Sequence, residues 1–247
     1  MPTDQSSEAS GVIETTIVGS VATVRWSRPE KRNAFDSSLA TRLANELNSL
    51  AENVDLSVVA LRSDGPIFCA GWDLDEIRGA TSQERAAELV GSGRRCLEAI
   101  DRLPQVVVTA IERSTLGFGV SLLTHSDVNL LSESARILLP ELQHGIVPAS
   151  VLGNLVAKVG RARALRWCLA GEVPLEEALA SGLVSELVKP QEFENAIDER
   201  IDSIARQVPA AIHATKRLSA TLRGDHSNAY ASGDAFAISM LASRVES

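Results

Sequence analysis

Four short stretches of this sequence carry residues that could do chemistry. Residues 27–34 form a proline- and cation-rich turn, and residues 68–74 and 116–119 form two glycine-bearing bends. The fourth stretch is Pro140-Glu141, whose apolar neighbours predict a buried carboxyl with a raised pKa. Such a carboxyl is suited to general acid and base catalysis near neutral pH. No single stretch is specific for one chemistry, so the interpretation depends on all four together.

The elements around the first stretch follow from the spacing of apolar residues. Residues 12–18 and 21–26 are β-rich and flank a Gly-Ser pair, which predicts a hairpin. Asp36 is a good N-cap, and leucines then recur at spacings of four, four and three, which predicts a helix. The cation-rich turn therefore lies between a hairpin and a helix.

The same kind of unit repeats further along the chain. Residues 56–61 and 106–111 are apolar runs typical of buried strands, and residues 86–100 have the period of an amphipathic helix. The order strand, glycine-bearing turn, helix, strand predicts an α/β fold. Other segments are expected as a helix over 116–124, strands over 128–131 and 136–139, and helices over 152–159, 162–170, 175–180, 193–208 and 210–222.

Charge and hydropathy argue against two classes of partner. The 247 residues are 45% hydrophobic with a net charge of -8 and only short basic runs, so nucleic acid is not expected. No apolar run approaches the roughly 20 residues that a membrane helix needs, so no membrane is expected either. Residues 1–10 lack the features of a signal or transit peptide, which predicts a disordered tail on a cytoplasmic protein.

The cysteines and histidines predict neither a disulfide framework nor a metal site. Cys69, Cys96 and Cys168 are odd in number and widely spaced, so we expect reduced thiols. The histidines occur singly, without the spacing of metal ligands. They are His125, His144, His213 and His226.

Six segments, in order along the chain, resemble motifs of the crotonase superfamily, which contains the enoyl-CoA hydratases and isomerases. The segments are 21–34, 68–74, 115–127, 140–148, 160–165 and 178–184. Chance agreement of six ordered motifs at compatible spacings is remote, and the resemblance covers roughly residues 11–245. It implies a crotonase-like spiral of repeated ββα units over residues 11–190, sheet-rich to about residue 150. Residues 191–247 would form a C-terminal helical region that assembles a homotrimer or hexamer.

The resemblance also implies an enzyme that acts on acyl-CoA, with the CoA thioester as substrate and no further cofactor. Reactions at the α or β carbon of such an ester pass through an enolate, whose oxyanion is stabilised by two backbone N–H donors in a dry pocket. By resemblance these donors belong to Trp72 and Phe118, the second at a helix N-terminus. The turns that hold them contribute further binding residues, namely Ala70, Gly71, Leu74, Gly117 and Gly119.

Phe118 departs from the family, which carries glycine at this position. Its side chain could crowd the thioester, in which case the second donor would shift toward Gly117 or Gly119. Trp72 is large enough to form a wall of the acyl pocket.

The general acid or base is expected to be Glu141. Hydratases of the family hold water between two glutamates, and here Ser121 stands at the first position and Glu141 at the second. One carboxylate can move a proton between two carbons, whereas hydration needs water activation and proton delivery at separate atoms. We therefore expect an isomerase-like enzyme that migrates a double bond, ahead of a hydratase-like one. Decarboxylation, C–C hydrolysis and C–C bond formation stay open, as does a partner protein of low activity.

A cationic edge for the phosphates of CoA is expected in the first turn. By resemblance, Arg28, Lys31 and Arg32 supply the positive charges there. A solvated basic turn is the alternative interpretation.

Three further roles near the base are expected. Asp73 stands where the family carries an aspartate that usually supports the turn, and Asp73, or Asp75 beside it, could instead serve as an auxiliary acid. His144 follows Glu141 by three residues and could tune its pKa. Ser121 could hydrogen-bond a water molecule or the substrate.

Overall fold

Two sheets form the centre of the molecule. The computed structural model describes residues 11–222 of the chain. The large sheet has the order β1-β2-β3-β5-β7-β10, and a small sheet has the order β4-β6-β8-β9. The large sheet consists of β1 (Val12–Val18), β2 (Val21–Ser27), β3 (Val58–Ser63), β5 (Val106–Ile111), β7 (Val128–Ser132) and β10 (Glu186–Val188). The small sheet consists of β4 (Ile67–Cys69), β6 (Ser114–Leu116), β8 (Ile137–Leu138) and β9 (Glu172–Val173).

The predicted hairpin is confirmed, and the strands after it run parallel. β1 and β2 pair antiparallel, and Gly19 between them takes φ +57°, a left-handed conformation that glycine adopts at little cost. β2, β3, β5, β7 and β10 then pair in parallel. Parallel strands are covered on both faces, which explains the apolar runs that predicted β3 and β5.

A two-strand unit repeats three times between β3 and β8. β3 is followed by β4, β5 by β6 and β7 by β8, and each pair gives its first strand to the large sheet and its second to the small one. Helices follow each pair and return the chain to the next unit. This repeat confirms the predicted α/β spiral of ββα units.

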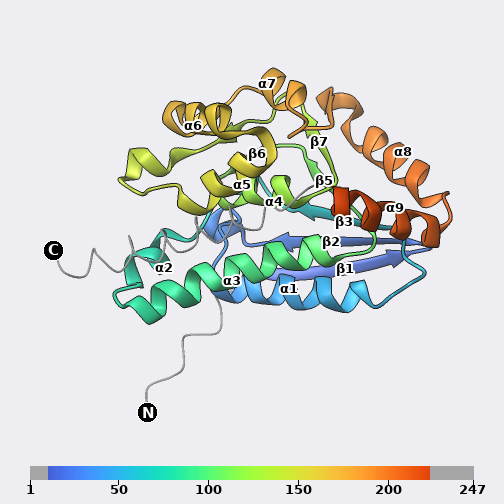
Figure 1. Cartoon of the computed structure of the whole chain (residues 1–247), viewed down its shortest axis with the longest axis horizontal. Coiled ribbons are helices and arrows are strands. Elements are labelled where there is room, and N and C mark those ends of the chain that lie inside the picture. Colours follow the sequence, from blue (N-terminus) through green and yellow to red (C-terminus); the bar gives the residue numbers. More distant parts are fainter. Residues whose placement is uncertain (1–10, 223–247) are drawn as a thin grey trace, which may run out of the picture.

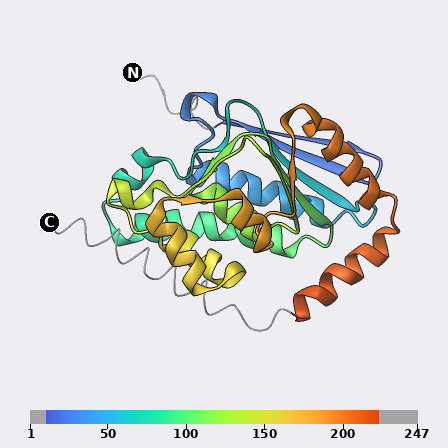
Figure 2. The ribbon, with the colours of Figure 1, turned by 90° about the horizontal axis from the view of Figure 1, so that it is seen from above.

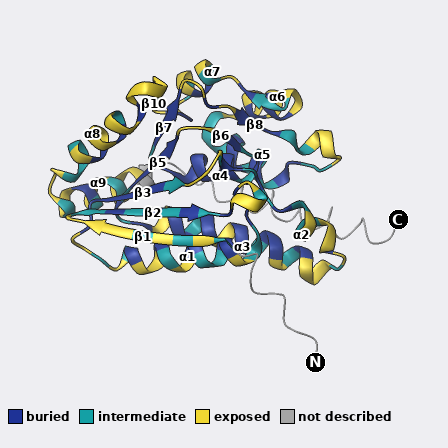
Figure 3. Ribbon diagram, turned by 180° about the vertical axis from the view of Figure 1, so that it is seen from behind, coloured by how far each residue is buried: buried dark blue, intermediate teal, exposed yellow. Residues whose placement is uncertain are grey.

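Helices cover both faces of the large sheet (Figures 1 and 2). α1 (Ser37–Ala51) and α3 (Gln83–Arg102) pack on one face, and α8 (Phe193–Ala205) packs on the other. Successive residues of β3 divide between the two cores: Val59 joins the core under α1 and α3, and Val58 joins the core under α8. Figure 3 shows the result: β3, β5 and β7 are mostly buried between helices whose outer surfaces are exposed, whereas the edge strand β1 is largely exposed.

The remaining helices lie around the small sheet and at the end of the described chain. They are α2 (Leu74–Gly79), α4 (Phe118–His125), α5 (Ala149–Val159), α6 (Arg161–Ala170), α7 (Leu175–Ala180) and α9 (Pro209–Leu222), with short 3-10 turns at Pro29–Lys31, Pro140–His144 and Pro190–Glu192. None of the helices within residues 11–222 is long and apolar enough to cross a membrane.

The structure differs from the sequence-based expectation in the second half of the chain. Only helices were expected past residue 150, yet β10 joins the large sheet beside β7. β10 has three residues, too few for a periodic signal. α8 buries Phe193, Ile197 and Ile201 against the sheet of its own chain, so this apolar face is not an assembly surface. The expected tail over 1–10 and the part of the helical region past residue 222 lie outside the described residues.

Candidate active site

One cavity of about 540 Å³ collects most of the residues that the sequence singles out. It lies between α3, α4 and α5 and the turns that follow β4 and β8. The predicted residues that line it are Arg32, Ala70, Gly71, Trp72, Leu74, Gly117, Phe118, Ser121, Glu141 and His144. Arg28, Lys31, Asp73 and Gly119 do not line it.

The pairing of the small sheet brings three of the predicted stretches together. β4 pairs in parallel with β6, and β6 pairs in parallel with β8, so the bends that follow these strands meet at one edge. A Cβ atom built on Gly117 would lie 2.9 Å from Glu141 Oε1 and 3.4 Å from the Cα atom of Gly71. Gly117 and Gly71 also take φ values of +50° and +93°. Both positions therefore favour glycine, because a side chain would be strained at either one, and a side chain at position 117 would also displace Glu141.

The thiol of Cys69 accepts hydrogen bonds from two backbone N–H groups at this edge. The N–H of Gly71 lies 3.4 Å from Cys69 Sγ, and the N–H of Gly119 also donates to it. Burial raises the pKa of the Cys69 thiol to about 12, so it stays neutral. Gly119 has no room for a side chain because Cys69 and Thr115 lie against it.

Two other backbone N–H groups are left without partners. The N–H of Gly117 donates to the carbonyl of Leu138 at 3.1 Å, so neither Gly117 nor Gly119 can supply a second donor to a ligand. The N–H of Trp72 and the N–H of Phe118 have no hydrogen-bond partner within residues 11–222. Phe118 is the first residue of α4, where the helix leaves its N–H groups free. The two candidate donors are thus Trp72 and Phe118.

The side chain of Phe118 packs into an aromatic cluster. Its ring centroid lies 5.0 Å from that of Trp72 and 5.2 Å from that of Phe35. Gly93 of α3 makes room for both cavity-lining rings, since a Cβ there would lie 3.1 Å from the Trp72 ring and 3.3 Å from the Phe118 ring. Gly93 is not among the residues predicted from the sequence. Its signal was a glycine inside a strong helix, which costs about 1 kcal/mol and usually marks a close approach.

Glu141 places a carboxyl with one unpartnered oxygen in the cavity wall. Its Oε2 atom is buried and has no hydrogen-bond partner within residues 11–222. Burial raises the pKa of Glu141 to about 7. Ser121 is almost fully buried and lines the same cavity one turn into α4, whereas His144 is exposed at the cavity rim. Leu142, expected to be buried beside Glu141, is 43% exposed.

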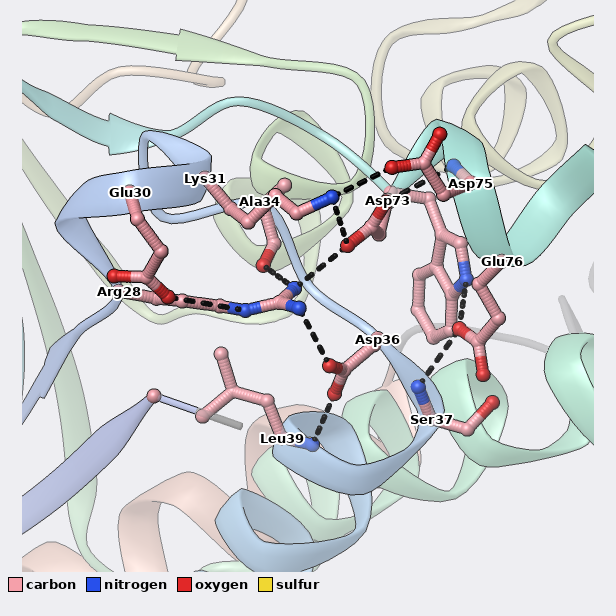
Figure 4. A network of polar contacts seen from close by, with 12 residues as sticks. Arg28, Glu30, Lys31, Ala34, Asp36, Ser37, Leu39, Asp73, Asp75 and Glu76 are labelled. Carbon is pink, nitrogen blue, oxygen red and sulfur yellow. Dashed lines mark hydrogen bonds and ion pairs between the residues drawn. The ribbon is translucent and has the colours of Figure 1, made fainter. Parts of the chain in front are cut away.

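The cation-rich turn divides into one structural arginine and one cavity arginine. Arg28, expected at the phosphates of CoA, is instead 3% exposed. Its guanidinium lies 3.0 Å from carboxylate oxygens of both Asp36 and Asp73 and donates to the carbonyl of Ala34 (Figure 4). Arg32 is exposed, lines the cavity and has no ion pair within residues 11–222. Arg32 is therefore the cation of this turn that a ligand in the cavity can reach.

The aspartates after β4 have structural partners. Asp73 caps α2 by accepting the N–H of Asp75 at 3.0 Å, and it also pairs with Arg28. Lys31 donates to Asp75 at 2.6 Å (Figure 4), and this contact lowers the pKa of Asp75. An ionised Asp75 outside the cavity is a poor proton donor at neutral pH. These contacts fit an aspartate that supports the turn, and they do not fit the alternative in which Asp73 or Asp75 serves as an auxiliary acid.

Known proteins resemble this chain over most of its length. The sequence model of the family described as enoyl-CoA hydratase/isomerase matches residues 16–244. The chain belongs to this family. It is 30% identical over 192 residues to the 2,3-dehydroadipyl-CoA hydratase of Escherichia coli K12, a match that covers 77% of this chain and 74% of that protein. The Delta(3,5)-Delta(2,4)-dienoyl-CoA isomerase of Arabidopsis thaliana is 29% identical, over 76% and 73% of the two chains.

Solved structures place the fold in the same group. An enoyl-CoA hydratase from Mycobacterium avium subsp. paratuberculosis superposes with a TM-score of 0.80 at 28% identity and covers 93% of this chain and 92% of its own. An enoyl-CoA hydratase from Mycobacterium smegmatis gives a TM-score of 0.82 at 26% identity, over 92% and 89%. This member of the enoyl-CoA hydratase/isomerase family is therefore an enzyme with the crotonase fold.

Replacing Arg28 tests its structural role. Arg28→Met leaves the carboxylates of Asp36 and Asp73 in a partly buried site without their cation, and should lower the free energy of unfolding by about 3 kcal/mol. Arg25→Met, which breaks the exposed pair with Asp64, should cost less than about 1 kcal/mol. Urea denaturation of both variants measures the difference. Equal losses in the two variants would show that the ion pairs of Arg28 stabilise the fold no more than an exposed ion pair does.

Replacing Glu141 tests the burial of its carboxyl. The pKa is about 4.5 for the ordinary group and about 7 in the folded protein, so the charged form destabilises the fold as pH rises through this window. Glu141→Gln should therefore be more stable than the parent above about pH 7, by at most about 3 kcal/mol, and equally stable near pH 4. Denaturation curves across this range provide the measurement. Glu133→Gln, an exposed control, should show no such trend.

Proposed function

We propose that this enzyme binds an enoyl-CoA thioester in the 540 Å³ cavity and moves its double bond, with Glu141 as the base. The observation that carries the proposal is that two free backbone N–H groups and a carboxyl with a buried, unpartnered oxygen converge on one cavity. Relatives named as a dehydroadipyl-CoA hydratase and a dienoyl-CoA isomerase support a CoA thioester as the substrate.

The two N–H groups supply the electrophilic half of the reaction. The thioester oxygen accepts hydrogen bonds from Trp72 N–H and Phe118 N–H, and the N-terminus of α4 adds a favourable dipole. Negative charge develops on this oxygen when a proton leaves the carbon chain, so donors already in place lower the barrier. The aromatic cluster holds both donor residues rigidly, because their side chains pack against each other and against Gly93.

Glu141 supplies the proton-transfer half. Its carboxylate removes a proton from one carbon of the acyl chain, which forms the enolate, and then returns that proton to a second carbon. A pKa near 7 suits both steps, because the group is neither too weak a base nor too weak an acid at neutral pH. Ser121, which lines the same cavity, has no carboxyl with which to hold a water molecule. The lone carboxyl therefore favours isomerisation over hydration.

Arg32 is the residue that we assign to the CoA phosphates. It is exposed at the cavity and free of ion pairs within the described chain, whereas Lys31 is engaged by Asp75. Guanidinium groups bind phosphate oxygens in a bidentate manner. A homotrimer or hexamer stays a prediction.

Glu141→Gln tests the assignment of the base. Proton exchange at the α carbon of a 3-enoyl-CoA in deuterated water should slow by about 10²–10⁴-fold, because the amide cannot accept the proton. In the parent, the exchange rate should rise about tenfold per pH unit below pH 7 and level off above it, since the ionised form is the base. Mass spectrometry of the recovered ester provides the measurement. Exchange at the parent rate in Glu141→Gln, with Glu133→Gln as control, would exclude Glu141 as the base.

Ser121→Glu tests why one carboxyl favours isomerisation. The new carboxylate faces the cavity that Glu141 also lines, so the variant should gain hydration of a 2-enoyl-CoA. The loss of absorbance of the conjugated thioester measures this gain. Ser121→Ala should show no gain. If a folded Ser121→Glu variant isomerises its substrate but does not hydrate a 2-enoyl-CoA, the absence of a second carboxylate does not explain why the parent favours isomerisation.

A further inference from the structure

The cavity changes character along its length. Gly93 of α3 lies against the Phe118 ring at the start of α4, and Asp101 of α3 contacts His125 at the end of α4. From Phe118 to His125 the helix rises about 10 Å. Near the two N–H donors the wall is aromatic and aliphatic, and toward His125 it becomes polar. From Gly93 toward Asp101, the cavity-lining side chains of α3 are Arg94, Leu97, Glu98 and Asp101.

His125 and Asp101 form a hydrogen-bonded pair at this polar end. His125 is 6% exposed, and its Nδ1 atom lies 2.9 Å from Asp101 Oδ2. An ionised carboxylate can only accept, so Nδ1 carries the hydrogen and donates it. The Nε2 atom of the neutral ring is then an acceptor. Asp101 thus sets both the orientation and the tautomer of a histidine that lines the cavity.

Asn154 of α5 adds a donor on the same cavity. It is 4% exposed, and among the α5 residues that line the cavity it lies farthest along the helix from Glu141. Its Nδ2 atom is buried without a hydrogen-bond partner within residues 11–222. A buried donor left unpaired costs free energy, which a ligand oxygen can recover. Hydrocarbon alone would leave it unsatisfied.

The charges nearby argue for an uncharged ligand group. Glu98 and Asp101 bring two carboxylates to this end, and Glu98 already engages both Arg94, whose Nε lies 3.7 Å from Glu98 Oε1, and Arg102, whose Nη2 lies 2.9 Å from Glu98 Oε2. A carboxylate at the end of an acyl chain would meet these carboxylates beside cations that are already paired. A hydroxyl both donates and accepts, which matches an imidazole acceptor together with an amide donor.

We propose that this end of the cavity is a specificity site for acyl chains that carry a hydroxyl group distal to the thioester, bound by His125 and Asn154. The inference rests on the proposed function, because it takes the acyl chain to run along α4 from the two N–H donors. Ser121 lies on α4 between Phe118 and His125 and also lines the cavity.

Binding of saturated CoA esters tests this site without any turnover. The probes are hexanoyl-CoA, its ω-hydroxy derivative and its ω-carboxy derivative, titrated calorimetrically into the full-length protein. The parent should bind the ω-hydroxy ester at least about 10-fold more tightly than either other ester. His125→Leu and Asn154→Leu should each reduce this preference to about twofold or less, while hexanoyl-CoA binds as tightly as before. His213→Leu, a histidine outside the cavity, should keep the preference.

The outcomes separate this inference from the proposed function. Equal affinities for the hydroxy and plain esters in the parent, or a preference that survives in both leucine variants, would overturn the specificity site. Tightest binding of the ω-carboxy ester would overturn its uncharged character. Hydroxy preference without proton exchange at the α carbon would overturn the proposed function and leave the site standing. Failure of all three esters to bind at millimolar concentration would overturn both.

Discussion

The parallel pairing of β4, β6 and β8 is the constraint on which the site depends. These strands have only two or three residues each, yet their register places the bends after them at one edge of the small sheet. Each bend then delivers one part of the chemistry: the N–H of Trp72, the N–H of Phe118 and the carboxyl of Glu141. A slip of one residue in any strand would turn its bend away and remove one of the three.

Close backbone approach makes this edge intolerant of side chains. Gly71 and Gly117 lie against each other, and Gly119 lies against Cys69. The buried thiol of Cys69 is neutral and accepts from the N–H groups of Gly71 and Gly119, which satisfies two donors that a ligand does not need. The fold itself therefore pairs the N–H groups of Gly71 and Gly119 and leaves those of Trp72 and Phe118 available to a ligand.

Two buried ionisable groups in this region, Arg28 and Glu141, have opposite effects on the stability of the fold. Arg28 is surrounded by acceptors, and it joins the N-caps of α1 and α2 through Asp36 and Asp73. Glu141 has no cation beside it and a buried oxygen without a partner, so its pKa rises toward neutrality. A fully paired charge stabilises the turn that positions the site, whereas an unpaired carboxyl costs stability and gains a proton affinity useful for catalysis.

Local sequence patterns alone determined the hairpin, the long helices α1 and α3 and the apolar strands β3 and β5, because periodicity and caps are properties of neighbouring residues. The ordered motifs also predicted the family, and with it Trp72, Phe118 and Glu141 as the residues of interest. Tertiary structure decided what spacing cannot encode. Arg28 faces aspartates rather than a ligand, β10 joins a sheet begun far upstream, and His125 meets Asp101 across two helices. The partner of a charged or polar side chain depends on which distant segments the fold brings beside it, and no local pattern carries that information.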